Sequence, residues 1–92
     1  MWGNEMKAVI TVIGKDRPGI IYRISKILFE SGINIEDISQ TIMQDYFTMI
    51  MLVKGPENAD IAALSEKMSV LADEGVSVSI QKSDIFDVMH KI

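Results

Sequence analysis

Residues 14–20 read GKDRPGI, and this stretch separates two apolar runs near the start of the chain. The run before it, Ala8 to Ile13 (AVITVI), is rich in β-branched residues and predicts a strand. Both faces of that strand are apolar, so we expect both to be at least partly covered, as in a central strand. The run after it predicts a helix to about Ser31, because its apolar residues have helical spacing: Ile20, Ile24, Ile27 and Leu28, with Ile21 beside them.

The stretch itself has the composition of a sharp turn from a strand into a helix. Pro18 has a fixed φ and no N–H, which suits the first turn of a helix. The N-cap would then be Asp16 or Arg17, of which only Asp16 has good capping chemistry. At the far end of the helix we expect Gly32 as the C-cap, because glycine adopts the left-handed conformation at little cost.

The next two apolar segments predict a hairpin. Residues 33–44 (INIEDISQTIMQ) read as a long strand in which the isoleucines change from odd positions to even ones. Since a strand cannot exchange its faces without an extra residue, we predict a bulge near Glu36-Asp37. Asp45-Tyr46 is the expected turn into a third strand, Phe47 to Lys54. One face of that strand carries Phe47, Met49, Met51 and Val53.

The remainder predicts a helix, a strand and a short terminal helix. Gly55-Pro56 ends the third strand, and Asn58 or Asp60 can cap a helix that runs to about Glu74 and ends at Gly75. The helix's apolar stripe is Ile61, Leu64, Met68 and Leu71. A fourth strand, Val76 to Gln81, has Val76, Val78 and Ile80 on its inward face. Asp84 would cap a C-terminal helix with Ile85, Met89 and Ile92 on one side.

This order of elements predicts an α+β fold, a ferredoxin-like βαββαβ sandwich with a short C-terminal helix. Right-handed crossovers would put both long helices on one face of the sheet. The C-terminal helix could dock on the open face or reach a partner. Met6 is the expected start of a single domain over residues 6–92, with residues 1–5 as a loose leader.

Composition disfavours several classes of function. The formal net charge is −4 and no cluster of Lys and Arg stands out, so direct binding to nucleic acid or to an anionic membrane is not expected. The chain has no cysteine and one histidine, His90. We therefore expect no metal site and no cofactor. No apolar run is long enough to span a membrane and the start lacks a signal-peptide core, so the expected location is the cytoplasm.

Two positions attract attention as candidates for binding. The GKDRPGI turn lacks the Lys-Ser/Thr of a nucleotide loop, but it leads into a helix N-terminus, which attracts carboxylates and phosphates. Gly19 has no Cβ, so a ligand could approach the backbone closely. A turn whose Pro and Gly serve geometry alone explains the residues equally well. Asn34 has an amide that suits an amino-acid ligand, although a simple polar residue at a strand start is the plainer interpretation.

GKDRPGI, the βαββαβ order and GINIEDIS together resemble the ACT domain, over nearly the whole chain. The chain is similar to small stand-alone members of that family. Similar segments open the ACT modules of a formyltetrahydrofolate deformylase and of a repressor of glycine cleavage. The resemblance implies regulation rather than catalysis, a homodimer, and an amino acid bound between the first β-α turn of one copy and the second strand of the other.

Carried onto this sequence, the resemblance implies six ligand-binding residues: Asp16, Arg17, Pro18, Gly19, Ile20 and Asn34. Because the resemblance covers nearly all of the 92 residues, we expect no attached enzyme or DNA-binding domain, and a regulated enzyme or transcription factor would be a separate protein. One alternative is a ligand-free interaction subunit that modulates such a partner. Another is an enzyme, because Arg17 and Asn34 superficially resemble the pair used by acylphosphatases, although Pro18 removes an N–H that a phosphate cradle needs.

Overall fold

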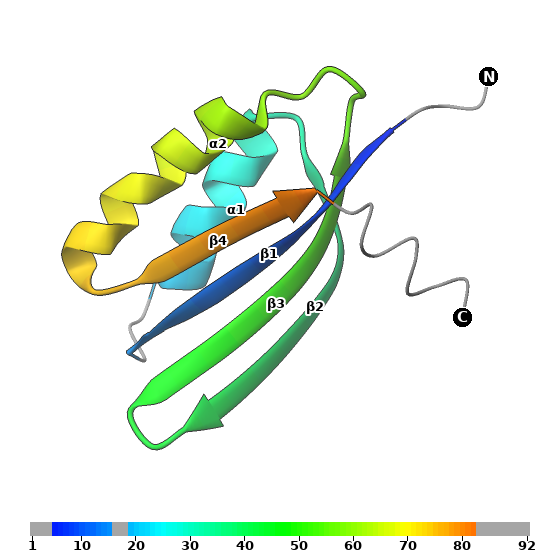
Figure 1. Cartoon of the computed structure of the whole chain (residues 1–92). Helices are drawn as coiled ribbons and strands as arrows, with labels where there is room; N and C mark the ends of the chain where they lie inside the picture. Colours follow the sequence, from blue (N-terminus) through cyan, green and yellow to red (C-terminus); the bar gives the residue numbers. More distant parts are fainter. Residues whose placement is uncertain (1–4, 16–18, 83–92) are drawn as a thin grey trace.

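The computed structural model describes residues 5–15 and 19–82. Its elements follow the predicted order (Figure 1). The strands are β1 (Met6–Lys15), β2 (Asn34–Met43), β3 (Tyr46–Gly55) and β4 (Ser77–Lys82). The helices are α1 (Ile20–Glu30) and α2 (Ile61–Met68), and α2 continues into the 3-10 helix η1 (Ser69–Glu74).

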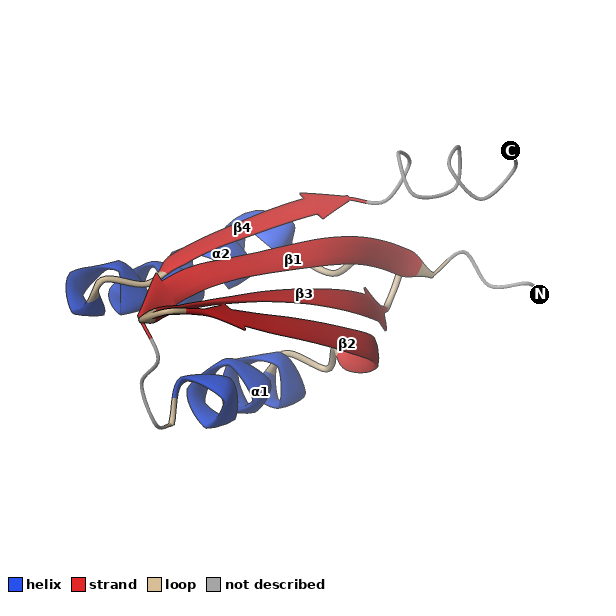
Figure 2. Ribbon diagram, turned by 90° about the horizontal axis from the view of Figure 1, so that it is seen from below, coloured by secondary structure: helices blue, strands red, loops and turns tan. Residues whose placement is uncertain are grey.

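The four strands form one sheet in the order β2-β3-β1-β4, with every neighbouring pair antiparallel. β1 and β3 pair along the whole of both strands, from Met6 opposite Gly55 to Lys15 opposite Tyr46. Residues from α1, α2 and η1 join the same buried cluster, so the helices form one layer against one face of the sheet (Figure 2). The predicted ferredoxin-like class is confirmed.

Alternation along the two central strands builds the core. In β1 and β3 the side chains on one face are buried and those on the other face are exposed or half-buried. The helices supply the other half of the core through the predicted stripes. Fully buried positions include Ile10, Val12, Ile24, Leu28, Met49, Met51 and Leu71.

α1 begins later than the sequence predicts. Its N-cap is Gly19, with a φ of 92°, and the first helical residue is Ile20. The prediction of a cap at Asp16 or Arg17 is therefore wrong. The reason is backbone geometry, since a left-handed residue interrupts the helical path and only glycine adopts it without strain.

The C-terminal end of α1 depends on the predicted glycine, although Ser31 occupies the cap position itself. Gly32 follows the cap with a φ of 74°, and its left-handed turn directs the Ile33 amide to donate to the Leu28 carbonyl at 2.9 Å. The helix therefore ends at Glu30, one residue earlier than predicted, and Gly32 occupies the position after the cap, from which the chain turns directly into β2.

The predicted bulge in the second strand is confirmed. Ile35 lies opposite Val53 and Asp37 lies opposite Leu52, so Glu36 is the extra residue in β2. The bulge lets Ile35 and Ile38 share the helix-side face despite their opposite parity. Most of β2 remains exposed in spite of this, because the strand forms one edge of the sheet.

The second helix is shorter than predicted as an α-helix. Asp60 is its N-cap, and the Ala63 amide donates to the Asp60 carboxylate at 3.0 Å. The α-helix ends at Met68 and continues as η1 to Glu74, with Gly75 at a φ of 80° ending it. The Ser69 hydroxyl donates to the Glu66 carbonyl at 2.6 Å, and such local bonds compete with the regular helical ladder.

The residues that the structure describes cover only one face of the sheet, the face against which the helices pack. Ile13 is 47% exposed and Ile50 is 44% exposed on the face opposite the helices. Among the described residues, the expected cover of β1 is confirmed on the helix side, while on the other face Val9 and Thr11 are half-buried and further cover of that face stays a prediction. Both helices lie on the same face, as right-handed crossovers require, and the predicted C-terminal helix lies outside the described residues.

We expect alanine substitution at two isoleucines of α1 to change the free energy of unfolding by very different amounts. Ile24 is fully buried, whereas Ile21 is 39% exposed on the same helix. Ile24→Ala should lower the free energy of unfolding by about 2–5 kcal/mol, since it removes core contacts and leaves a cavity. Ile21→Ala should cost no more than about 1 kcal/mol. Urea denaturation measures both, and equal losses would contradict the described core.

Candidate functional site

Three of the six predicted ligand-binding residues lie in the described part of the chain. These are Gly19, Ile20 and Asn34, whereas Asp16, Arg17 and Pro18 lie outside it. Ile20 is only 1% exposed and belongs to the core. Its side chain therefore anchors α1 to the sheet, and only its backbone could contact a ligand.

The beginning of α1 has the electrostatic character of an anion site. An added Cβ at Gly19 would meet no atom of the described residues within 4 Å, so these residues leave the space above its backbone open. The Gly19 carbonyl accepts a hydrogen bond from the Arg23 amide at 2.9 Å, the first bond of the helix. No acidic side chain occupies the first turn. The first amides of the helix therefore favour a nearby negative group.

Asn34 is the first residue of β2 and is exposed. It lies opposite Lys54 of β3, which in turn lies opposite Lys7 of β1. The Lys54 ammonium nitrogen lies 3.6 Å from a Glu5 carboxylate oxygen and 3.8 Å from one of Glu36. Asn34 thus ends a row of charged side chains that crosses the sheet.

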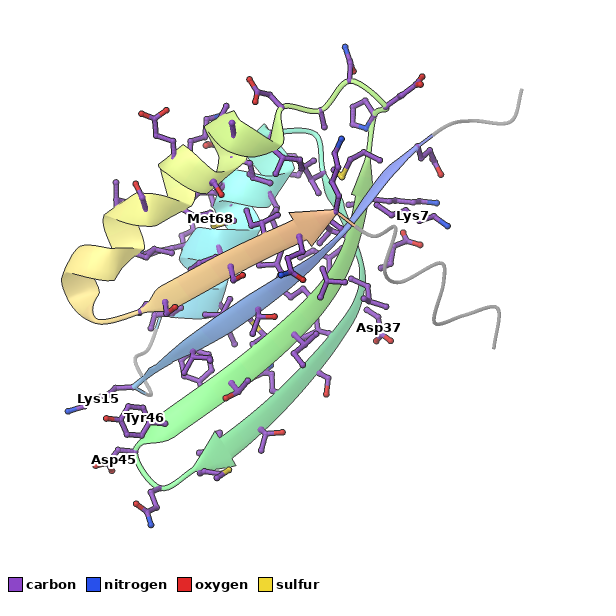
Figure 3. The ribbon with its side chains drawn as sticks, viewed as in Figure 1. Lys7, Lys15, Asp37, Asp45, Tyr46 and Met68 are labelled. Carbon is purple, nitrogen blue, oxygen red and sulfur yellow. The ribbon has the colours of Figure 1, made fainter. Side chains whose placement is uncertain are left out.

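Within one chain, Gly19 and Asn34 lie at opposite ends of the sheet. The turn that contains Gly19 follows Lys15, which pairs with Tyr46, whereas Asn34 lies in the row of Lys7. Figure 3 shows Lys15 and Tyr46 at one end and Lys7 at the other. The distance along β1 between the two rows is roughly 26 Å at the usual rise of a strand. The structure does not bring the two candidate positions together in a single copy.

The β2 edge is the longest unpaired edge of the described sheet. β2 has ten residues and pairs on one side only, with β3. Its exposed apolar side chains include Ile42, 61% exposed, and Met43, 68% exposed. An unpaired, apolar edge strand is a template for pairing with another strand.

Three surface features escaped the sequence analysis. Tyr22 and Phe29 lie on the outward side of α1, 67% and 83% exposed. They are seven residues apart, so they lie on the same face of the helix, and this spacing could have been read from the sequence. A hollow of about 450 Å³ between α2 and β4 is lined by Ser65, Met68 and Val76, among others. A second, of about 330 Å³, is lined by Lys7, Asp37, Leu52 and Lys54, among others.

Neither of these two hollows includes Gly19 or Asn34 in its lining. Among the described residues, no three His, Cys, Asp or Glu side chains cluster as metal ligands would. No helix in residues 5–15 and 19–82 has the length and apolar character that crossing a membrane requires. At the two candidate positions, the described groups available for binding are the backbone amides at the start of α1 and the Asn34 side chain.

The comparison with known proteins agrees with this fold. The family model described as "ACT domain" matches residues 7–81. A UPF0237 protein of Methanosarcina acetivorans is 50% identical over 91 residues, covering 97% of this chain and 99% of its relative. The solved structure of an ACT domain protein from Streptococcus pneumoniae is 43% identical, with a TM-score of 0.78 over 90% of this chain and 96% of that one.

More distant structures share the fold alone. A formyltetrahydrofolate deformylase from Pseudomonas putida superimposes with a TM-score of 0.73 at 13% identity, over 82% of this chain and 28% of the deformylase. The match to the ACT domain covers the sheet and both helices, and close relatives align with this chain almost from end to end. The protein is a member of the ACT domain family.

Proposed function

We propose that the protein is a non-catalytic regulatory module that binds an amino acid between two copies of the chain. The observation that carries this proposal is the placement of Gly19 and Asn34 at opposite ends of a sheet whose edge strand, β2, is free. A site that needs both residues requires a second copy.

Antiparallel pairing of β2 with the β2 of a second copy satisfies that requirement. A two-fold axis at this edge reverses the direction of the second strand. The Asn34 end of one copy then meets the Met43 end of the other. Met43 pairs with Tyr46, and Tyr46 pairs with Lys15, the second residue of the GKDRPGI stretch. Two equivalent sites result, each with a turn from one copy and an Asn34 from the other.

The chemistry at this junction suits an amino acid. The α1 N-terminus favours a carboxylate, and Gly19 allows close approach to the backbone. The Asn34 side chain accepts from an ammonium group or donates to a carboxylate. The family resemblance adds Asp16, Arg17 and Pro18 of the same turn to the proposed contacts. Because the amino acid would contact both copies, its binding would stabilise the dimer as well as the fold of each copy.

We expect one or more of the common amino acids to raise the thermal stability of the protein. At a hundredfold excess over Kd, binding should add about 2.7 kcal/mol to the free energy of unfolding. Gly19→Ala and Asn34→Ala should remove most of that gain. Thermal-shift screening followed by calorimetry measures the response.

Gly75→Ala is the matched control for Gly19→Ala. Gly75 has a φ of 80° and equally open space around a would-be Cβ, so alanine causes the same backbone strain away from the proposed site. This variant should lose stability but keep the ligand response. A flat response of the unmodified protein to every amino acid would contradict the proposal, as would loss of the response in all three variants.

Disruption of the β2 edge should dissociate the proposed dimer. Ile42 is 61% exposed, so Ile42→Glu leaves the single chain folded but places a charge in the strand pairing. Val70→Glu, at a position that is 55% exposed on η1, introduces the same charge away from the edge. Analytical ultracentrifugation should show a monomer for Ile42→Glu and a dimer for Val70→Glu. A monomeric unmodified protein would refute the shared site.

The outward side of α1 favours a second candidate function, a protein-interaction subunit that needs no ligand. Phe29 is 83% exposed and Tyr22 is 67% exposed, and large aromatic side chains supply much of the binding energy at interfaces. A separate enzyme or transcription factor is the kind of partner that the family resemblance implies. Phe29→Ala should weaken binding to such a partner and leave the amino-acid response intact, whereas Gly19→Ala should do the reverse.

A further inference from the structure

We propose that the open face of the sheet is the docking site of the chain's own C-terminal segment, residues 83–92 (SDIFDVMHKI). The docked segment would form a third layer opposite the helices. This inference concerns a surface that plays no part in the proposed amino-acid site, so the two can fail independently. It rests on the pattern of the open face, on the place where β4 ends, and on the charges near that place.

The open face has an apolar centre and a polar frame. Its rows follow from the pairing of the strands. One row holds Asp37, Leu52, Val9 and Gln81 in the order β2-β3-β1-β4. The next row holds Ser39, Ile50, Thr11 and Ser79, and the one after it holds Thr41, Thr48, Ile13 and Ser77.

In these rows the apolar side chains belong to the two central strands, whereas both edge strands contribute only polar ones. An apolar strip therefore runs along β1 and β3, from Leu52 and Val9 through Ile50 to Ile13. Ile50 and Ile13 are 44% and 47% exposed, so described residues leave much of the strip in water. A polar frame around an apolar strip is typical of a surface that receives another element.

β4 delivers the C-terminal segment to one end of this strip. Lys82, the last residue of β4, pairs with Ala8, so the segment that follows begins beside the row of Lys7 and Lys54. The hollow of about 330 Å³ lined by Lys7, Asp37, Leu52 and Lys54 lies in this same region. A segment that turns back over the sheet from this point meets Leu52 and Val9 first.

The segment has the length and the apolar pattern that the strip requires. From Val9 to Ile13 the strip is roughly 13 Å long at the rise of a strand. Ten residues in a helix extend about 15 Å. Ile85, Met89 and Ile92 recur at helical spacing and would supply one apolar face over that length. Placed against the strip, this face would remove apolar surface from water on both sides.

Charges favour the same arrangement. Lys7 lies directly opposite Lys54, and like charges in that position repel. Lys54 has ion pairs with Glu5 and Glu36, whereas no ion pair joins Lys7 to another residue of the described ranges. Asp84 is the second residue of the segment, close to where the chain leaves β4. Its carboxylate would compensate Lys7.

Paramagnetic relaxation enhancement tests the proposal on the full chain. The protein contains no cysteine, so Lys91→Cys provides a single site for a spin label, away from the apolar face of the segment. We expect the strongest loss of amide signal at Ile13, Thr48 and Ile50 in the labelled protein, because the end of the docked segment lies over that part of the strip. Tyr22 and Phe29, on the outward side of α1, should keep their intensity. Absence of signal loss at the open face would overturn the proposal.

A mixed sample separates the chain's own segment from that of a second copy. Spin-labelled protein without ¹⁵N is mixed with ¹⁵N-labelled protein without the spin label. We expect the loss at the open face in this sample to be much weaker than in the labelled chain, because pairing through β2 would keep the partner's label several strands away. Loss of equal strength would overturn the proposal in favour of a second copy on this face or a segment exchanged between copies.

A pair of variants tests the apolar strip itself. Ile50→Lys should restore the signals of the open face, because a charge in the strip opposes docking. Val70→Lys, at a position of comparable exposure on η1, should leave the signal loss unchanged. Equal loss of amide signal at the open face in the two variants would contradict the assignment of the strip as the docking surface.

Discussion

The pairing of β1 with β3 is the constraint on which the rest of the structure depends. The two strands are in register over their whole length, so each row of the sheet has one side chain from each strand on the same face. Ile10 lies opposite Met51 and Val12 opposite Met49, and these four side chains are completely buried beneath the helices. A slip of one residue would move all of them to the open face and expose the core. Helix packing, the β4 pairing and the position of the GKDRPGI turn all follow from this register.

The same constraint determines which surfaces are left for function. Both described helices pack on the same face of the sheet, so within residues 5–15 and 19–82 the opposite face and the β2 edge remain exposed. The β2 edge offers backbone pairing to a second copy, and the open face offers an apolar strip close to where β4 ends. Assigning the edge to a second copy and the face to the chain's own segment leaves the outward side of α1, with Phe29, for other partners. A second copy, the C-terminal segment and another partner could therefore bind to the three surfaces at the same time.

The sequence predicted the features that depend on side-chain patterns. The change of parity among the isoleucines of β2 predicted the bulge at Glu36, and the glycine after α1 predicted a left-handed turn. Features that depend on backbone geometry were harder to foresee. Asp16 and Pro18 fit the start of a helix well, but nothing in the residue types reveals that Gly19 is left-handed and that α1 begins after it. The 3-10 continuation after Met68 is equally hidden, because the apolar stripe continues through Leu71. For the candidate site, pattern and resemblance gave Gly19 and Asn34, but only the strand pairing revealed that one copy separates them.

A crystal structure of the protein grown with the amino acid that stabilises it most would test the shared site most directly. We expect a dimer joined through β2, with the ligand's carboxylate at the start of α1 in one copy and the Asn34 amide of the other copy within hydrogen-bonding distance. A dimer joined through another surface, with Gly19 and Asn34 of different copies far apart, would contradict it.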